Sequence, residues 1–218
     1  GGAAETGFFG GIDAFAGAMH GSSGTRDGGA AFAGGGVVQD VEFRNATGIG
    51  GHAGYRFDSP WSMFVGYQHF RGKVAWNAYF PAYEIESGFA GRANSNVITA
   101  NVAREFPLSD TLAVTASAGA GAAFNRLSGV VEKDVGTGLF LSDVGGHRKT
   151  SPVARLDLGI RYRPTPKTRL GLGASFAYGG DFQTADWRSG NLGVTEITPY
   201  RLDGVWRAGL LATVQRDF

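Results

Sequence analysis

The sequence contains no cysteine among its 218 residues. This absence excludes disulfide bonds, thiolate metal sites and a cysteine nucleophile. A charge excess of either sign is also missing, because the formal net charge at pH 7 is +1. The charge balance of the whole chain therefore indicates neither nucleic acid nor an anionic surface as a partner.

Long apolar runs are missing as well. No stretch reaches the roughly 18 apolar residues that a transmembrane helix needs. The longest apolar-looking run, Leu112 to Phe124, is interrupted by Thr115 and Ser117. No signal peptide is visible, so we expect the mature form of an exported chain, from which that peptide has been removed.

Glycine is the residue in excess, with 37 copies against only 7 prolines. The chain has no three-residue period, which excludes a collagen-like helix. Disorder is disfavoured because 43% of the residues are hydrophobic and the aromatic residues recur at intervals. The glycines are therefore expected to serve a packed structure.

Strict alternation of apolar and polar residues predicts β-strands. In Arg155 to Tyr162 one face carries leucine, isoleucine and tyrosine, and the other carries charge and glycine. The segments 169–178 and 206–215 alternate in the same way. Five further segments fit less perfectly: Gly7–Met19, Thr47–Phe57, Trp61–Phe70, Asn96–Phe106 and Leu112–Phe124. The total is eight strands of about ten residues, the length that crosses a bilayer at a tilt.

The connecting segments alternate in length. Residues 58–60, 107–111 and 164–168 are short and rich in turn residues, whereas 20–46, 71–95, 125–151 and 180–203 are long. This pattern is typical of an outer-membrane barrel with short periplasmic turns and long extracellular loops. The predicted fold is thus all-β: one domain, residues 1–218, forming a transmembrane up-and-down antiparallel barrel of eight strands.

Aromatic residues near the strand ends favour the same fold. Outward aromatic residues are expected at headgroup height on both sides of an apolar band. The predicted girdle residues are Phe8, Tyr55, Phe57, Trp61, Tyr67, Phe106, Phe124, Tyr162, Phe176, Trp206 and Phe218. A soluble β-sandwich or lipocalin-like barrel is the alternative, but it would turn its charged face outward and its apolar face inward.

The whole chain resembles, in pattern, the small outer-membrane barrels of the OmpA, OmpX, NspA and opacity types. The sharpest local likeness is the last strand, Trp206 to Phe218, although Arg216 stands where an apolar residue is commoner. The resemblance implies that the barrel-assembly machinery reads this strand through the terminal Phe218. It also implies an integral protein of the Gram-negative outer membrane, in contact with lipid and lipopolysaccharide.

Alternation predicts a polar lumen. Its expected members are Asp13, His52, Arg56, Gln68, Asn101, Glu105, Arg155, Asp157, Arg161, Arg207 and Asp217. Buried charges must be paired, so arginines bridged to carboxylates are expected. Arg56, Glu105, Arg161 and Asp217 are expected to form one layer, and Asp13, His52, Gln68, Asn101 and Asp157 a second. A plugged, stabilised barrel is favoured over a narrow ion or solute path, because eight strands leave a small bore.

Other sites in the sequence are weaker. None of the four histidines has a serine at the spacing of a lipid A deacylase, so a lipid-modifying enzyme is the third hypothesis, and no metal or cofactor motif is found. Trp76, Tyr79, Phe80 and Tyr83 would either bind a ligand in a loop or pack across a protruding hairpin. The alanine face Ala116–Ala122 is a weak candidate for a docking partner or a second copy. The leading interpretation is a structural or surface-interaction role through the extracellular loops.

Overall fold

The computed structural model describes residues 6–27, 36–81, 83–191 and 193–218. These residues form β-strands connected by short turns, and none of them forms a helix that is long and apolar enough to span a membrane. The strands are β1 (Gly7–Ser22), β2 (Arg26–Asp27), β3 (Gly36–Arg56), β4 (Trp61–Phe80), β5 (Ile85–Pro107), β6 (Leu112–Asp134), β7 (Phe140–Thr165), β8 (Thr168–Gly190), β9 (Gly193–Glu196) and β10 (Arg201–Asp217).

The long strands close into an antiparallel ring. Each pairs with its neighbour in sequence, while β8 pairs with β10 and β1 closes the ring by pairing with both β10 and β3. The two short strands extend the wall, β2 beside β3 and β9 beside β8. The eight-stranded up-and-down barrel predicted from alternation is confirmed.

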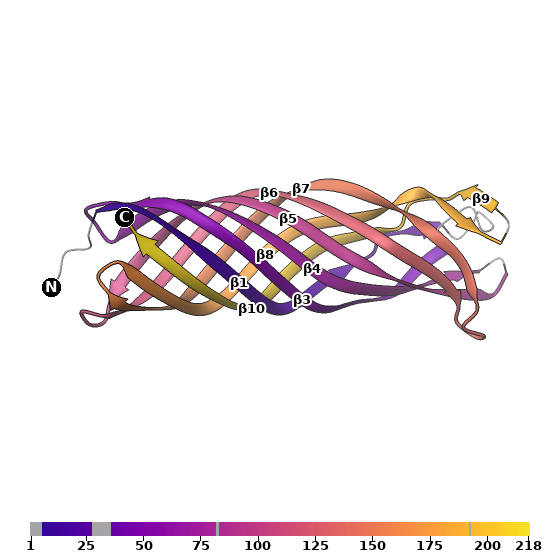
Figure 1. Ribbon diagram of the computed structural model, residues 1–218. Coiled ribbons are helices and arrows are strands. Elements are labelled where there is room, and N and C mark those ends of the chain that lie inside the picture. The colour runs from indigo at the N-terminus through magenta and orange to yellow at the C-terminus, as the bar shows by residue number, and fades with distance from the viewer. Residues whose placement is uncertain (1–5, 28–35, 82, 192) are drawn as a thin grey trace.

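The two ends of the barrel differ (Figure 1). The start of β1 and the end of β10 lie at one end, together with the connections β3–β4, β5–β6 and β7–β8. We call this the turn end. The opposite, distal end holds β9 and the connections β4–β5 and β6–β7.

The strands are longer than the sequence pattern indicated. The eight strands of the ring run for 16 to 26 residues, whereas about ten residues are enough to cross a bilayer. Most of the residues expected in long loops are therefore strand. Residues 71–80 continue β4, 85–95 begin β5, and only residues 81–84 connect the two. The barrel wall extends well beyond the length that a membrane covers.

The interior has two chemically different halves. Toward the turn end the inward side chains are polar or charged. Toward the distal end most of them form an apolar core, in which Trp76 stacks on Phe89 with ring centroids 5.4 Å apart and Tyr200 packs against both. This half also holds a buried carboxylate, Glu132, which pairs with Arg188 at 3.1 Å. On the outward face, exposed Ile, Val and Leu side chains form an apolar band on the part of the wall nearer the turn end.

Glycine allows one aromatic ring to lie across the inner wall. Gly17 of β1 pairs with Gly209 of β10, and both face inward. A Cβ atom at either glycine would lie 2.8 Å from the Phe15 ring and closer still to backbone of the partner strand. The Phe15 ring, which is edge-on to Phe70, can occupy this position because neither glycine has a side chain.

Among the described residues, the widest interruption of the sheet ladder lies between β7 and β8. Their pairing is lost between Gly146↔Thr184 and Ala154↔Tyr178, where Pro152 has no N–H to donate and Gly180 has a φ of +77°. The buried Asn125 amide of β6 reaches across this gap and donates to the Gly179 and Asp181 carbonyls of β8, at 2.7 and 2.9 Å. The gap is therefore bridged by a side chain.

Candidate functional site: the barrel lumen and its rims

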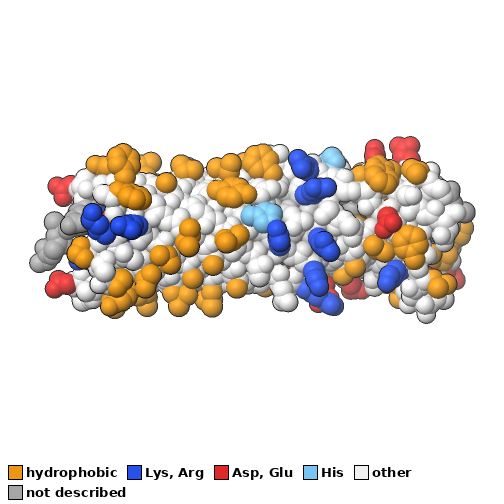
Figure 2. All heavy atoms as spheres, viewed as in Figure 1, with side chains coloured by type: hydrophobic (Ala, Val, Ile, Leu, Met, Phe, Trp, Pro, Cys, Tyr) orange, Lys and Arg blue, Asp and Glu red, His pale blue; other side chains and the backbone are white. Residues whose placement is uncertain are grey.

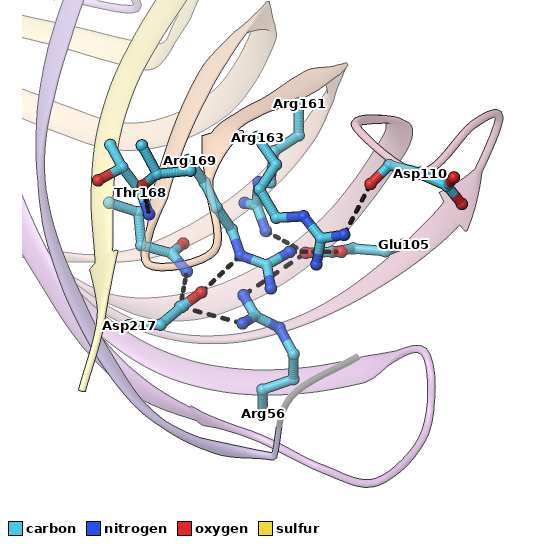
Figure 3. A network of polar contacts seen from close by, with 10 residues as sticks. Arg56, Glu105, Asp110, Arg161, Arg163, Thr168, Arg169 and Asp217 are labelled. Carbon is cyan, nitrogen blue, oxygen red and sulfur yellow. Dashed lines mark hydrogen bonds and ion pairs between the residues drawn. The ribbon is translucent and has the colours of Figure 1, made fainter. Parts of the chain in front are cut away.

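A cluster of charged side chains crosses the lumen at the turn end (Figure 3). Glu105 lies at its centre and contacts three guanidinium groups: Arg161, Arg169 at 3.2 Å, and Arg56 at 3.6 Å. Asp217 accepts from Arg56 at 3.0 Å and from Arg169 at 2.7 Å. We call these five residues the turn-end cluster.

The turn-end cluster joins strands that are far apart around the ring. Its members come from β3, β5, β7, β8 and β10, so their ion pairs span the bore. The Arg56 and Arg169 side chains are only 3% and 6% exposed. Such pairs resist the separation of opposite walls, because a guanidinium that loses its carboxylate would remain buried and unpaired.

The next level of the lumen contains two separate polar groups. His52 Nδ1 lies 3.0 Å from both carboxylate oxygens of Asp13. Elsewhere Arg155 donates to Asp157 at 2.9 Å and to Gln68 at 2.6 Å. Both groups line an internal cavity of about 70 Å³, a size that holds on the order of five water molecules. The cavity is a local hollow at this level of the lumen.

Two residues expected in the network do not join it. The Asn101 amide donates to Thr99 Oγ1 at 3.0 Å and contacts no charged group. Arg207 is 2% exposed and places its guanidinium 3.8 Å from the centroid of the Phe70 ring, where its Nε and Nη1 have no hydrogen-bond partner. Cation–π contact and not a carboxylate holds this arginine.

The sequence analysis omitted Arg169 from the network. Arg169 is the one member of the turn-end cluster that bonds to both Glu105 and Asp217 by hydrogen bonds. Arg169 faces inward because it alternates with the outward Leu170, so the alternation of side chains along the strand was enough to predict Arg169 as a lumen residue. Alternation gives the face of a strand but not the height at which barrel shear places each residue.

The apolar core fills the bore above the polar levels. Its largest fully buried side chains include Trp76, Tyr200, Phe89 and Phe182. Of the four aromatic residues that were considered as loop ligands, Trp76 and Phe80 are 1% and 3% exposed and point into this core. Tyr79 is half-buried on β4, and Tyr83 is 46% exposed at the distal tip.

The residues assigned to the aromatic girdles all lie on the outer surface. At the turn end these are Phe8, Tyr55, Phe57, Trp61, Phe106, Tyr162 and Phe218, and further along Tyr67, Phe124, Phe176 and Trp206. Phe8 packs edge-on to Tyr55, and the Arg104 guanidinium covers the rings of Trp61 and Phe106. Figure 2 shows apolar side chains spread over this part of the wall.

No metal centre is found within the described part of the chain, where three or more potential ligands nowhere gather. His69 is an outward residue whose Nδ1 lies 2.8 Å from the Asn96 amide oxygen and whose Nε2 accepts from Arg71. His20 stacks on Trp206. Neither arrangement pairs a histidine with a serine.

An apolar outer band, aromatic rims and a charged lumen in a closed antiparallel ring define a transmembrane β-barrel. Residues 6–198 match the family model of the outer membrane protein beta-barrel domain. The chain belongs to this family and is an integral protein of the Gram-negative outer membrane, in contact with its lipid and lipopolysaccharide. In this setting the turn end faces the periplasm and the distal end faces outward.

Three solved structures illustrate the likeness. Neisserial surface protein A is 19% identical, each chain covers 97% of the other, and the TM-score is 0.53. Ail of Yersinia pestis is 13% identical with a TM-score of 0.48, covering 98% of this chain and 100% of Ail. OprG of Pseudomonas aeruginosa is 11% identical with a TM-score of 0.43, covering 98% of this chain and 97% of OprG. No curated protein matches the sequence. At these identities the comparison with Neisserial surface protein A shows a shared fold.

Proposed function

We propose that the protein is a non-conducting scaffold that anchors an interaction surface at the outside of the cell. The main support for a non-conducting barrel is that side chains fill the bore at successive levels. Glu105 and its arginines cross it near the periplasm, and Trp76, Phe89 and Tyr200 fill it further out. A cavity of about 70 Å³ lies between these levels. A narrow channel is the less favoured alternative.

The distal tip supports the second half of the proposal. It presents several exposed apolar side chains, including Leu139 at 66%, Val194 at 73% and Trp187 at 46% exposure. Apolar side chains that gather in water-exposed positions mark contact sites for a partner. The rigid, filled barrel beneath them would hold this surface in place without loop ordering. A lipid-modifying enzyme remains the third hypothesis, without a nucleophile beside any described histidine.

Two partner assignments are also part of this proposal. Recognition of the last strand by the assembly machinery is supported by Phe218, which is 79% exposed at the turn end. Docking on the face Ala116–Ala122 is supported by the sheet register, because Ala120 pairs with Ala100 on one side and Ala154 on the other. Replacing Ala118 with tryptophan is expected to lower the native mass of any complex formed there, and an unchanged mass would exclude that face.

Planar-bilayer recording of the refolded protein tests the closed lumen. Protein shown to be folded is expected to give no discrete openings. The variants Arg155→Gln and Asp157→Asn, which alter the mid-lumen pair, are expected to stay silent as well. Reproducible openings in the wild type whose size changes in either variant would establish a channel and end the proposal.

Because the sequence has no native cysteine, single-cysteine variants that carry a crosslinker can test the interaction surface. A single Val194→Cys variant carries a photo-crosslinker at the distal tip, and Ser109→Cys carries the same group at a periplasmic turn as the control. Crosslinking on intact cells is expected to give one discrete adduct from Val194→Cys only. No adduct, or equal adducts from both positions, would contradict a partner at the tip.

A further inference from the structure

A basic surface lies on the outside of the barrel just beyond its outer aromatic rim. Seven Lys and Arg residues line an open hollow of about 1220 Å³ on the outer wall, without any Asp or Glu among the described lining residues. We call them the basic patch: Arg44, Arg71, Lys73, Arg92, Arg126, Arg148 and Lys149. Six of them face outward, whereas Lys149 lies opposite the inward Asn125. In Figure 2 the Lys and Arg side chains gather beyond the apolar part of the wall on the distal side.

The sheet register forces these like charges together. Lys73 of β4 lies directly opposite Arg44 of β3 on one side and Arg92 of β5 on the other. In a second row Arg126 of β6 lies opposite Arg148 of β7. Directly opposed side chains in antiparallel strands have Cβ atoms about 5 Å apart, so like charges there repel and destabilise the sheet.

Little within the chain neutralises the basic patch. Arg44 pairs with Glu42 and Lys149 with Asp181, while Arg71 uses its Nε to donate to His69. The side chains of Lys73, Arg92, Arg126 and Arg148 make no ion pair or hydrogen bond with any described residue. An anion supplied from outside the chain would remove the repulsion.

The height of the basic patch on the barrel wall indicates which kind of anion can bind it. Along β4 the outward residues run Tyr67, His69, Arg71 and Lys73, so the first cation follows the rim tyrosine by four residues. On β6 Arg126 follows the rim Phe124 by two residues, about 7 Å along the strand. Aromatic rims mark headgroup height, so the cations stand at the level of the outer-leaflet phosphates and sugars.

The basic patch occupies one side of the barrel. At the corresponding height β8, β10 and β1 carry Tyr178, Trp206 and His20, which lie in register beside one another. His20 and Trp206 stack at 4.4 Å, and no cation is found in this row. A general attraction to the membrane surface would be served by cations all round the wall, whereas a one-sided hollow fits a specific ligand.

We propose that the basic patch binds the phosphorylated sugar headgroup of an outer-leaflet glycolipid, with its acyl chains lying on the apolar wall below. Two rows of cations, Arg44–Lys73–Arg92 and Arg71–Arg126–Arg148, match a headgroup that carries more than one phosphate. The site orients the barrel's distal surface relative to the lipid on one side. It does not depend on whether the lumen conducts.

Binding of lipid A by the refolded protein in detergent tests this site by native mass spectrometry. The patch variant combines Lys73→Gln, Arg92→Gln and Arg126→Gln. The control variant combines Lys133→Gln, Lys167→Gln and Arg216→Gln, which are exposed positions and remove the same charge. Bis-phosphorylated lipid A is expected to bind the patch variant about tenfold or more weakly than the wild type, and the control within about twofold.

Further arms separate the possible ligands. Dephosphorylated lipid A is expected to bind wild type and patch variant equally weakly, and a charge-retaining variant with Lys73→Arg, Arg92→Lys and Arg126→Lys is expected to keep binding. Heat-modified gel mobility verifies that each variant is folded. Equal affinity of wild type and patch variant for bis-phosphorylated lipid A would overturn the proposal. Inositol hexakisphosphate that binds the wild type as tightly as lipid A would overturn it too, in favour of a soluble polyanion.

Discussion

Replacing Glu105 by glutamine is the sharpest perturbation of the lumen. Among the described residues Glu105 is the only acidic partner of Arg161, and it shares Arg56 and Arg169 with Asp217. The amide keeps the size of the side chain but removes its charge. Three arginines would then face one carboxylate, and Arg161 would lose its ion pair altogether.

The loss of unfolding free energy in Glu105→Gln follows from the burial of the ion pair. Breaking a buried ion pair by neutralising one partner costs about 3–5 kcal/mol. The side chains of Glu105 and Arg161 are still 13% and 17% exposed, which places Glu105→Gln near the lower limit, about 3 kcal/mol. The double variant Glu105→Gln with Arg161→Gln removes one charge of each sign and leaves Arg56 and Arg169 beside Asp217. Its cost is expected to be smaller than the sum of the two single variants.

Urea unfolding of the protein in lipid vesicles, followed by tryptophan fluorescence, measures these differences. Arg163→Gln is the matched control, since Arg163 is adjacent in sequence but donates only to the backbone carbonyl of Asp110 in an exposed turn. It is expected to cost about 0.5 kcal/mol or less. A loss below about 1 kcal/mol for Glu105→Gln, or strict additivity in the double variant, would refute the reasoning.

Two further outcomes are expected. Trp76→Ala removes the largest buried ring of the distal core and should cost about 4 kcal/mol of unfolding free energy, against about 0.5 kcal/mol for the exposed Leu139→Ala; equal small losses would mean that this core does not support the barrel. Burial opposes the charged form of Asp181, but the Gly204 N–H and the Lys149 ammonium outweigh it and hold the Asp181 pKa below its ordinary value of 3.8. These two contacts of the Asp181 carboxylate therefore stabilise the fold above about pH 4, and their contribution is lost as the pH falls through the lowered pKa. The urea midpoint of the wild type is expected to drop more between pH 6 and pH 3 than that of Asp181→Asn, and identical drops would contradict this account.

The small net charge of the whole chain concealed the basic patch. The net charge of +1 gave no indication of an anionic partner. All seven residues of the basic patch fall in segments expected to be loops. Because those segments are strands, the register places their cations opposite one another, which no linear pattern displays.

The sequence by itself determined the barrel, its strand count and which residues face lipid. These depend on a local rule, because successive side chains of a strand point to opposite faces. Alternation at Arg155 to Tyr162 was enough to separate the lipid face from the lumen face. The outward aromatic residues then predicted the two limits of the membrane band.

Only the tertiary structure decided which inward side chains contact one another across the bore. Strand tilt and shear set the height of each inward residue, so Arg169 reaches Glu105 and Asp217 while Arg207 lies against Phe70. The same limit applies to Trp76, whose alternation continued beyond the expected end of β4 into a core made by several strands. The local sequence determines whether a side chain points to the lumen or to the lipid, whereas its contacts across the lumen depend on the closure of the whole ring.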